Sequence, residues 1–285
     1  VKEYTLVVYS FILFIIKLAF KEDKIMAMFL LQKDDDALEI EEAIIEDLLK
    51  RNKYTHEYST CTLKKIDDAT NDKMIPVGTI DFVTKYMSKF AYCSHEVPVE
   101  IPKYLQTEEF LKRDYKICKW DEIPRHGKFF LKDVSELKKY GNVTDATYMN
   151  IDDLFNYVPK SDFDSTLVLS KEHMYQVSSL LPIQTEYRVY VINNEIVAIT
   201  NYEGSPLNIP DAKLLQKAVS LIQFNEKWLQ SYTIDIAVGK FGTAILEIHN
   251  FTSVGLYHAL WGSELLYAYV DGINYLKNDN SVKYL

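Results

Sequence analysis

The amino-acid sequence predicts an α/β (α+β) fold, because two kinds of strand pattern occur in one chain. Residues 28–63 show an apolar strand, an amphipathic helix and a second strand in succession, the pattern of an α/β unit. Residues 186–200 and 233–248 each show two apolar runs around a short turn, which is typical of antiparallel hairpins. A hydrophobic content of 48% over 285 residues is sufficient for a large core in one or two domains.

The first unit begins with a short apolar strand at Met28–Gln32. We interpret the Asp34–Asp36 cluster that follows as a helix N-cap rather than a metal site, since acidic side chains are favoured in the first turn of a helix. Apolar residues recur at helical spacing over 37–51, and residues 56–63 are expected to form the second strand.

The next stretch is predicted to contain a tight loop at 75–79 and a helix over 81–90. Gly78 and Thr79 fit either a phosphate cradle at the start of the helix or a plain turn capped by threonine, which is the simpler interpretation. Prolines punctuate the charged stretch 98–124, which we expect to be a linker between the two halves of the chain.

The second half is predicted to be rich in strands. Residues 128–132 and 165–170 are apolar runs of strand length. The hairpin over 186–200 turns at Asn193 and Asn194, because asparagine tolerates the positive φ that a two-residue hairpin loop requires. Helices are expected at 211–228 and 261–276.

The composition limits the class of protein. A net charge of −9 argues against a nucleic-acid binder held by a broad basic surface. The three cysteines are well separated, so they predict reduced thiols in a cytoplasmic protein rather than disulfides or a zinc site. The apolar run 5–16 is shorter than the roughly 20 residues that a spanning helix needs. We therefore expect residues 1–25 to be an extension outside the functional core, with a membrane anchor as the alternative.

The hairpin over 233–248 is predicted to place two carboxylates opposite each other. A three-residue loop, Lys240–Gly242, ends in glycine, as such loops commonly do. This loop makes Gly239 and Thr243 the closing pair, and it sets Asp235 opposite Glu247. The other face of the hairpin then carries an apolar set, Ile234, Ile236, Val238, Leu246 and Ile248.

Two like charges directly opposite one another destabilise a sheet, so this pairing suggests a chemical purpose. A cation held between Asp235 and Glu247 removes the repulsion, and hard cations such as Mg²⁺ prefer carboxylate oxygens. The alternative is a pair of carboxylates on a solvated strand face, with the neighbouring His249 incidental. Arg188 raises a similar choice, because its partner is either Glu186, two residues away on the same strand face, or an anionic ligand.

The order of these parts resembles the ATP-grasp fold, and in particular the R2K-type ATP-grasp proteins. The segments that carry the resemblance are IPVGTIDFV (75–83), KFFLKD (128–133), TEYRVYVINNEIVAI (185–199), TIDIAV (233–238) and LEIHNFTSVGLY (246–257). The resemblance implies an N-terminal pre-ATP-grasp α/β subdomain followed by two antiparallel-sheet lobes that clasp ATP. It places the pre-ATP-grasp domain and linker at 26–125, and the nucleotide-binding and catalytic domain at 126–285.

The resemblance also implies roles for individual residues. Lys132 is similar to the lysine that contacts the nucleotide phosphates. Lys171 and Glu172 fall near the hinge where adenine and ribose are held. Arg188 is similar to the family's arginine near the transferred phosphate, and both it and Lys132 are the expected catalytic residues.

The metal ligands that the resemblance implies are Asp235 and Glu247, with Mg²⁺ as the ion. The family has Glu-x-Asn at the second metal strand, whereas here the residue two positions beyond Glu247 is His249 and the asparagine is Asn250. Either His249 takes the ligand position, or a bulge brings Asn250 round, and we favour Asn250 because imidazole suits Mg²⁺ less well than oxygen does.

The activity that the resemblance implies is an ATP-dependent ligase that joins a carboxylate to an amine through an acyl phosphate. The expected partners are ATP and a small carboxylate or peptide substrate with an amine acceptor. One alternative is an ATP-binding or scaffold protein without catalysis, which His249 favours. Another is a nucleotidyl transferase with Lys132 as nucleophile, although the Lys-x-Asp-Gly context of such enzymes is absent.

Overall fold

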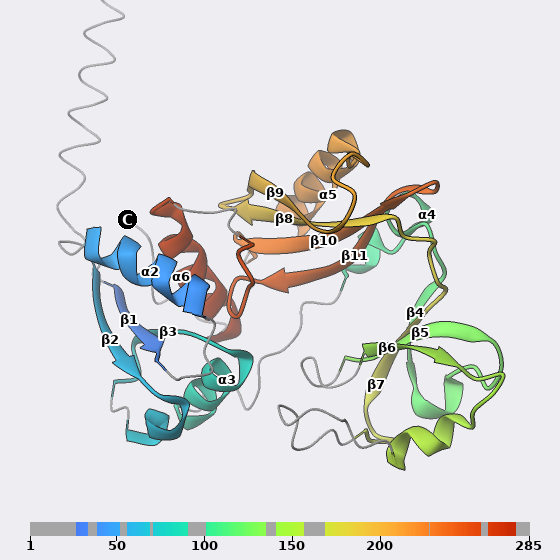
Figure 1. Cartoon of the computed structure of the whole chain (residues 1–285), viewed down its shortest axis with the longest axis horizontal. Coiled ribbons are helices and arrows are strands. Elements are labelled where there is room, and N and C mark those ends of the chain that lie inside the picture. Colours follow the sequence, from blue (N-terminus) through green and yellow to red (C-terminus); the bar gives the residue numbers. More distant parts are fainter. Residues whose placement is uncertain are drawn as a thin grey trace, which may run out of the picture.

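The computed structural model contains three β-sheets in the described residues, and helices cover parts of them (Figure 1). The residues described are 27–33, 39–51, 56–68, 71–90, 101–134, 141–156, 169–227, 229–257 and 262–277. The predicted Asp34–Asp36 cap and the apolar run 5–16 lie outside these residues. None of the helices in the described part has the length and apolar character that crossing a bilayer requires.

The N-terminal unit is a parallel three-stranded sheet of order β2-β1-β3, which confirms the predicted α/β unit. Its strands are β1 (Ala27–Gln32), β2 (His56–Cys61) and β3 (Met74–Val77). Helix α2 (Glu39–Arg51) connects β1 to β2, as parallel strands require a crossover. Helix α3 (Ile80–Lys89) follows β3.

The segment predicted as a loop at 75–79 is mostly strand. Ile75, Pro76 and Val77 belong to β3 and pair with β1. Proline is acceptable here because β3 is at the edge of its sheet, where one row of backbone groups needs no partner. Thr79 caps α3 as the simpler interpretation proposed, since its hydroxyl accepts a hydrogen bond from Phe82 N.

The C-terminal helix α6 (Glu264–Lys277) returns to the N-terminal unit. In Figure 1 this red helix lies beside the blue helix α2, although the two come from opposite ends of the chain. Its apolar face is buried in the same core as β1, β3, α2 and α3, and this confirms that the predicted last helix packs inward. Gly272 permits the contact, because a Cβ at this position would lie 2.0 Å from the backbone oxygen of Phe251.

The second sheet is antiparallel, with the order β4-β7-β5-β6. Its strands are β4 (Tyr115–Lys119), β5 (Lys128–Asp133), β6 (Gly141–Asp145) and β7 (Met174–Ser178). The prediction of a linker over 98–124 is wrong, because that stretch contains the short helix α4 (Glu108–Leu111) and β4, which pairs with β7. Strand β4 therefore precedes residue 126, where the predicted second domain begins, yet shares a sheet with β5.

The strand predicted over 165–170 is absent from the two residues of that range that the structure describes. Residues 165–168 lie outside the described residues, and 169–170 are not in a strand. The sheet uses β7 instead, whose mixed sequence MYQVS gives little apolar signal.

The third sheet is antiparallel, with the order β11-β10-β8-β9. The predicted turn between β8 (Thr185–Ile192) and β9 (Glu195–Gly204) is confirmed, with Asn193 at φ 51° and Asn194 at φ 64°. Helix α5 (Ala212–Asn225) packs on one face of this sheet, which leaves the opposite face to carry polar side chains.

The β10 (Tyr232–Gly239) and β11 (Gly242–Asn250) hairpin keeps the predicted pairing but reaches it differently. Gly239 pairs with Gly242, so the loop has two residues rather than the three that were predicted. A bulge at Leu246 then shifts the register by one, and Asp235 lies opposite Glu247 as expected. The prediction that Leu246 lies on the apolar face is wrong. Because of the bulge, Ile245 enters the core and Leu246 lines a cavity.

The close contact at Gly272 gives a test of how α6 is held. Replacing Gly272 with alanine is expected to lower the free energy of unfolding by about 2 kcal/mol, because the new methyl group meets backbone. An unobstructed helix would instead gain about 1 kcal/mol from the same change. Urea unfolding measures the difference.

Gly141→Ala is the matched control, since the nearest atom to its added Cβ is 3.6 Å away. This variant is expected to stay within about 0.5 kcal/mol of the wild type. A Gly272→Ala protein that is as stable as the wild type would show that α6 does not approach the backbone of Phe251, the residue after β11, so closely.

Candidate active site

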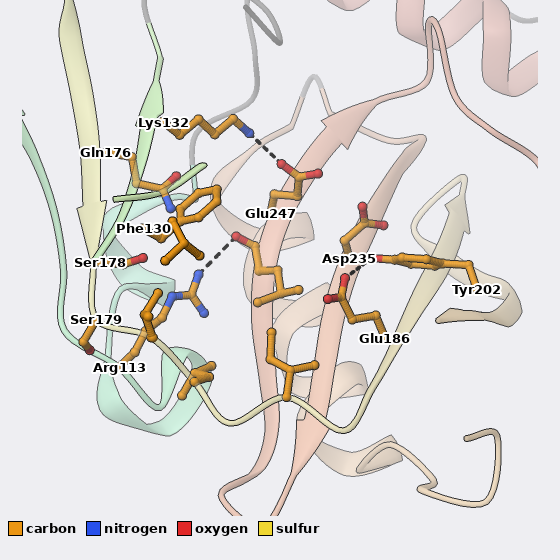
Figure 2. Close-up of a pocket in the computed structure, with 15 residues that line it drawn as sticks. Arg113, Phe130, Lys132, Gln176, Ser178, Ser179, Glu186, Tyr202, Asp235 and Glu247 are labelled. Carbon is orange, nitrogen blue, oxygen red and sulfur yellow. Dashed lines mark hydrogen bonds and ion pairs between the residues drawn. The ribbon is translucent and has the colours of Figure 1, made fainter. Parts of the chain in front are cut away.

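A cavity of about 440 Å³ lies between the second and third sheets, within the usual size range of small-molecule sites. Figure 2 shows side chains from both sheets converging on it. Its apolar lining consists of Phe130, Val143, Leu180, Leu181, Ile183 and Leu246. Its polar lining consists of Arg113, Lys132, Gln176, Ser178, Ser179, Glu186, Tyr202, Asp235 and Glu247.

Lys132 and Glu247 join the two sheets across this cavity. Lys132 Nζ, at the end of β5, lies 2.6 Å from Glu247 Oε2 on β11 (Figure 2). The two side chains are partly exposed, at 14% and 33%. The structure therefore brings together the predicted phosphate lysine and one predicted metal carboxylate, which are 115 residues apart in the sequence.

Asp235 and Arg188 form a second, more deeply buried ion pair. Arg188 Nε and Nη2 each donate to a different Asp235 oxygen at 2.7 Å, the bidentate geometry that arginine favours. Glu186, one of the two partners that the sequence left open for Arg188, does not pair with it, because Asp235 lies directly opposite Arg188 in the pairing of β8 with β10. Glu186 instead accepts a hydrogen bond from Tyr202 Oη at 2.6 Å.

Aromatic rings and a carbonyl group complete the surroundings of Arg188. Its guanidinium lies 5.1 Å from the ring centre of Tyr257 and 6.0 Å from that of Tyr202, and these two rings are stacked. Its Nη1 also donates to Gly255 O. Burial by itself would lower the pKa of Arg188, but the contact with Asp235 outweighs it and raises the pKa above its ordinary value.

His249 joins Asp235 and Glu247 in one group. His249 Nε2 lies 2.7 Å from Glu247 Oε1, and ligand atoms of all three residues lie within 4.8 Å of one another. Burial by itself would raise the pKa of Glu247, but the contacts with His249 and Lys132 hold it well below its ordinary value. Glu247 is therefore ionised at neutral pH.

The structure does not bring Asn250 into this group, although the sequence favoured it as the ligand. Asn250 lies opposite Tyr232, which faces the core under α5, whereas Glu247 and His249 alternate onto the other face. The bulge in β11 precedes Glu247, so it does not turn Asn250 round. Asn250 Oδ1 instead accepts a hydrogen bond from Thr252 Oγ1.

Lys171 and Glu172 are not among the residues that line the cavity. They lie in an exposed turn before β7, where Lys171 Nζ is 5.6 Å from the ring centre of Phe155. The segment that crosses from β7 to the third sheet runs from the other end of that strand. Ser179, Leu180 and Leu181 from this crossover line the cavity instead.

Arg113 is a site residue that the sequence analysis missed. It lies between α4 and β4, and its guanidinium donates to Ile245 O at 2.8 Å and to Leu246 O at 3.2 Å. These carbonyls belong to the bulge, where a regular ladder is interrupted. Burial lowers the pKa of Arg113. The charged stretch around it was interpreted as a linker, so nothing in the local pattern pointed to this role.

Two comparisons identify the family and the fold. The model for the ATP-grasp domain, R2K clade family 2, matches residues 110–262, which is more than half of the chain. The chain therefore belongs to the R2K clade of ATP-grasp domain proteins, as its sequence resemblance implied. The search of curated proteins found no match.

Solved structures share the architecture at low sequence identity. The D-cycloserine synthetase DcsG matches with a TM-score of 0.53 and 9% identity, over 87% of this chain and 100% of its own. D-alanine–D-alanine ligase from Bacillus anthracis matches with a TM-score of 0.51 and 11% identity, over 89% and 99%. These likenesses confirm the predicted ATP-grasp fold.

The buried pair of Asp235 and Arg188 gives a first test of the site. Asp235→Asn is expected to lower the free energy of unfolding by about 3 kcal/mol, because it leaves a buried guanidinium without a counter-charge. The double variant Asp235→Asn/Arg188→Gln should be less destabilised than the two single variants together. Glu109→Gln, in the exposed pair with Lys217, is the control and should cost less than about 1 kcal/mol. Additive losses in the double variant would contradict a direct pair.

Arg113 gives a second test. Arg113→Met is expected to lower the free energy of unfolding by about 2–3 kcal/mol, since two bulge carbonyls lose a charged donor. Arg113→Lys keeps the charge but not the planar fork, so it should recover less than half of that loss. Thermal unfolding compares both with Arg51→Met, which removes an exposed arginine and should be nearly neutral. Full recovery by lysine would mean that charge alone matters.

Proposed function

We propose that this protein is an ATP-dependent ligase that joins a carboxylate to an amine through an acyl-phosphate intermediate. The observation that carries the proposal is that Lys132, Asp235 and Glu247 line one cavity between two sheets, with Arg188 paired to Asp235. Membership of the ATP-grasp family supports it. The names of the similar structures, a synthetase and a ligase, are consistent with it.

The cavity has an apolar part and a polar part, which match the adenine ring and the phosphates of ATP respectively. The apolar side, which includes Phe130, Val143 and Leu180, suits a flat adenine ring. The polar end carries the Lys132 ammonium, which suits phosphate oxygens. We place the adenine against the crossover after β7 rather than near Lys171 and Glu172, because the crossover lines the cavity and those two residues do not.

Asp235 and Glu247 are the residues that would hold Mg²⁺. Two carboxylates on neighbouring strands fit a hard cation, and their present cationic partners show that the pair needs positive charge. When bound, the metal supplies charge that neutralises phosphate oxygens. His249, the third member of the group, is a nitrogen donor and fits Mg²⁺ less well than an oxygen donor does.

The reaction divides into two substitutions. A carboxylate oxygen of the substrate attacks the γ-phosphorus of ATP, the bond to the bridging oxygen breaks, and ADP leaves. The amine then attacks the acyl carbon, phosphate departs, and the amine loses a proton to solvent. Arg188 and Lys132 balance the negative charge of the transferred phosphoryl group, and the rate comes from positioning rather than from a nucleophilic side chain.

A non-catalytic ATP-binding protein is the second candidate. The observation that favours it is that both carboxylates already have cationic partners, Lys132 for Glu247 and Arg188 for Asp235. The nucleotidyl transferase alternative receives no such support, because Lys132 Nζ is held by an ion pair rather than presented as a nucleophile.

The test uses Lys132 and Glu247, which are partly exposed and tolerate change better than the buried Asp235. ATP with Mg²⁺ is expected to raise the melting temperature of the wild type, because a ligand that binds only the native state stabilises it. Lys132→Met and Glu247→Gln should lose most of this shift. Lys128→Met, an exposed lysine on the same strand, is the control and should keep it.

ADP release in the presence of mixed carboxylates and amines then separates the two candidates. Release that requires both substrate classes supports the ligase. A melting shift without ADP release supports the non-catalytic protein. If ATP and Mg²⁺ leave the melting temperature unchanged, both candidates fail.

A further inference from the structure

His249 is built into the carboxylate group rather than placed beside it. It follows Glu247 by two residues on β11, so both side chains project from the same face as Asp235. The exposed fraction of the residue is 9%. The donor atoms of the three residues lie within 4.8 Å of one another. Ligands that lie about 2.0–2.2 Å from one Mg²⁺ or transition ion are at most about 4.4 Å apart, so a small side-chain adjustment suffices to chelate such an ion.

The existing contacts show which possible ligand atoms of this group already have partners on other strands. Both oxygens of Asp235 already accept hydrogen bonds from Arg188, and Glu247 Oε2 pairs with Lys132. Glu247 Oε1 and His249 Nε2 lie 2.7 Å apart, yet Nε2 makes no aligned hydrogen bond to any described residue. Within the group, these two atoms therefore contact each other and not Lys132 or Arg188.

A second buried donor points to the same place. Thr233 lies directly opposite His249 in the pairing of β10 with β11, and it is fully buried. Its hydroxyl has no hydrogen-bond partner among the described residues. Buried polar atoms are normally paired, so a buried hydroxyl that has no partner and lies on the strand position opposite His249 indicates a ligand that both side chains would contact.

We propose that His249 is a nitrogen ligand to the metal of this site, and that it makes the site select a divalent first-row transition ion over Mg²⁺. The proposal rests on the proposed function, because it concerns the ion held by Asp235 and Glu247. Imidazole binds transition ions more strongly than it binds Mg²⁺, which takes oxygen ligands and keeps its waters. A carboxylate pair with one imidazole is therefore a mixed oxygen and nitrogen site.

The competing explanation is that His249 only contacts Glu247 and never the ion. In that case a bound ion would contact oxygen atoms alone, and its preference would not depend on the imidazole. The two explanations differ in whether a protein nitrogen is bonded to the ion, which spectroscopy detects directly.

The experiment uses Mn²⁺ as the probe, with the full chain labelled with ¹⁵N and ATP at natural isotope abundance. Pulsed electron paramagnetic resonance of bound Mn²⁺ is expected to show a ¹⁵N coupling, which the unlabelled nucleotide does not produce. The coupling should vanish in His249→Asn. It should persist in His126→Asn, which replaces an exposed histidine away from the cavity.

Titrations of Mn²⁺ and Mg²⁺ in the presence of ATP give the second readout. His249→Asn is expected to lower the ratio of Mn²⁺ to Mg²⁺ affinity by about tenfold or more, since even indirect metal partners are worth 10–100-fold. Melting curves without metal confirm that the variant is folded. The spectrum of the wild type needs no variant, so the proposal stays testable if His249→Asn does not fold.

The outcomes separate this proposal from the proposed function. Bound Mn²⁺ without ¹⁵N coupling in the wild type, or an unchanged affinity ratio in His249→Asn, overturns the role of His249 and leaves the ATP site standing. Failure of the wild type to bind either ion, with or without ATP, overturns the metal site itself and the ligase proposal with it.

Discussion

The repulsion between Asp235 and Glu247 is the constraint around which the site is organised. The β10–β11 hairpin places these carboxylates opposite one another, and cations from two other strands stabilise them. Arg188 reaches Asp235 from the next strand, Lys132 reaches Glu247 from another sheet, and His249 contacts Glu247 from its own strand. Each carboxylate therefore has a cationic partner from another strand.

One of these carboxylates, Glu247, also links the two antiparallel sheets. Without Lys132, the partly exposed Glu247 would have no cation from the opposite sheet, and the cavity between the sheets would lose a link across it. Arg113 provides a second link, because it reaches from the segment before β4 to the bulge carbonyls on β11. The bulge therefore has two consequences: it sets the register of the carboxylates, and it gives the other sheet a point of attachment.

Sequence reasoning recovered the elements whose pattern is local. The β8–β9 turn at Asn193 and Asn194 and the inward face of α6 follow from residue type and periodicity, and both are confirmed. The opposition of Asp235 and Glu247 was also predicted, although from a loop one residue too long. The bulge at Leu246 adds one residue to β11 and so offsets the shorter loop, which leaves Asp235 opposite Glu247 as predicted. The assignment of Leu246 to the core was wrong, because it lines the cavity.

Other features had no local signature. Strand β7 has too few apolar residues to stand out, so the sequence analysis did not locate the crossover after it, which lines the cavity. Arg113 lies in a charged stretch that gives no sign of contact with β11, more than a hundred residues away. The ion partners of Lys132 and Arg188 were likewise missed, because each contact joins segments that only folding brings together.

The sequence by itself determined the α/β and antiparallel character of the fold, the family resemblance and the strand faces on which the charged residues lie. These follow from the two-residue period of a strand and the 3.6-residue period of a helix, which are properties of the local backbone. The tertiary structure alone decided which charges meet, that no bulge after Glu247 brings Asn250 round to the carboxylates, and where the cavity lies. Those outcomes depend on how separate sheets pack and where a strand bulges, and no local period encodes either.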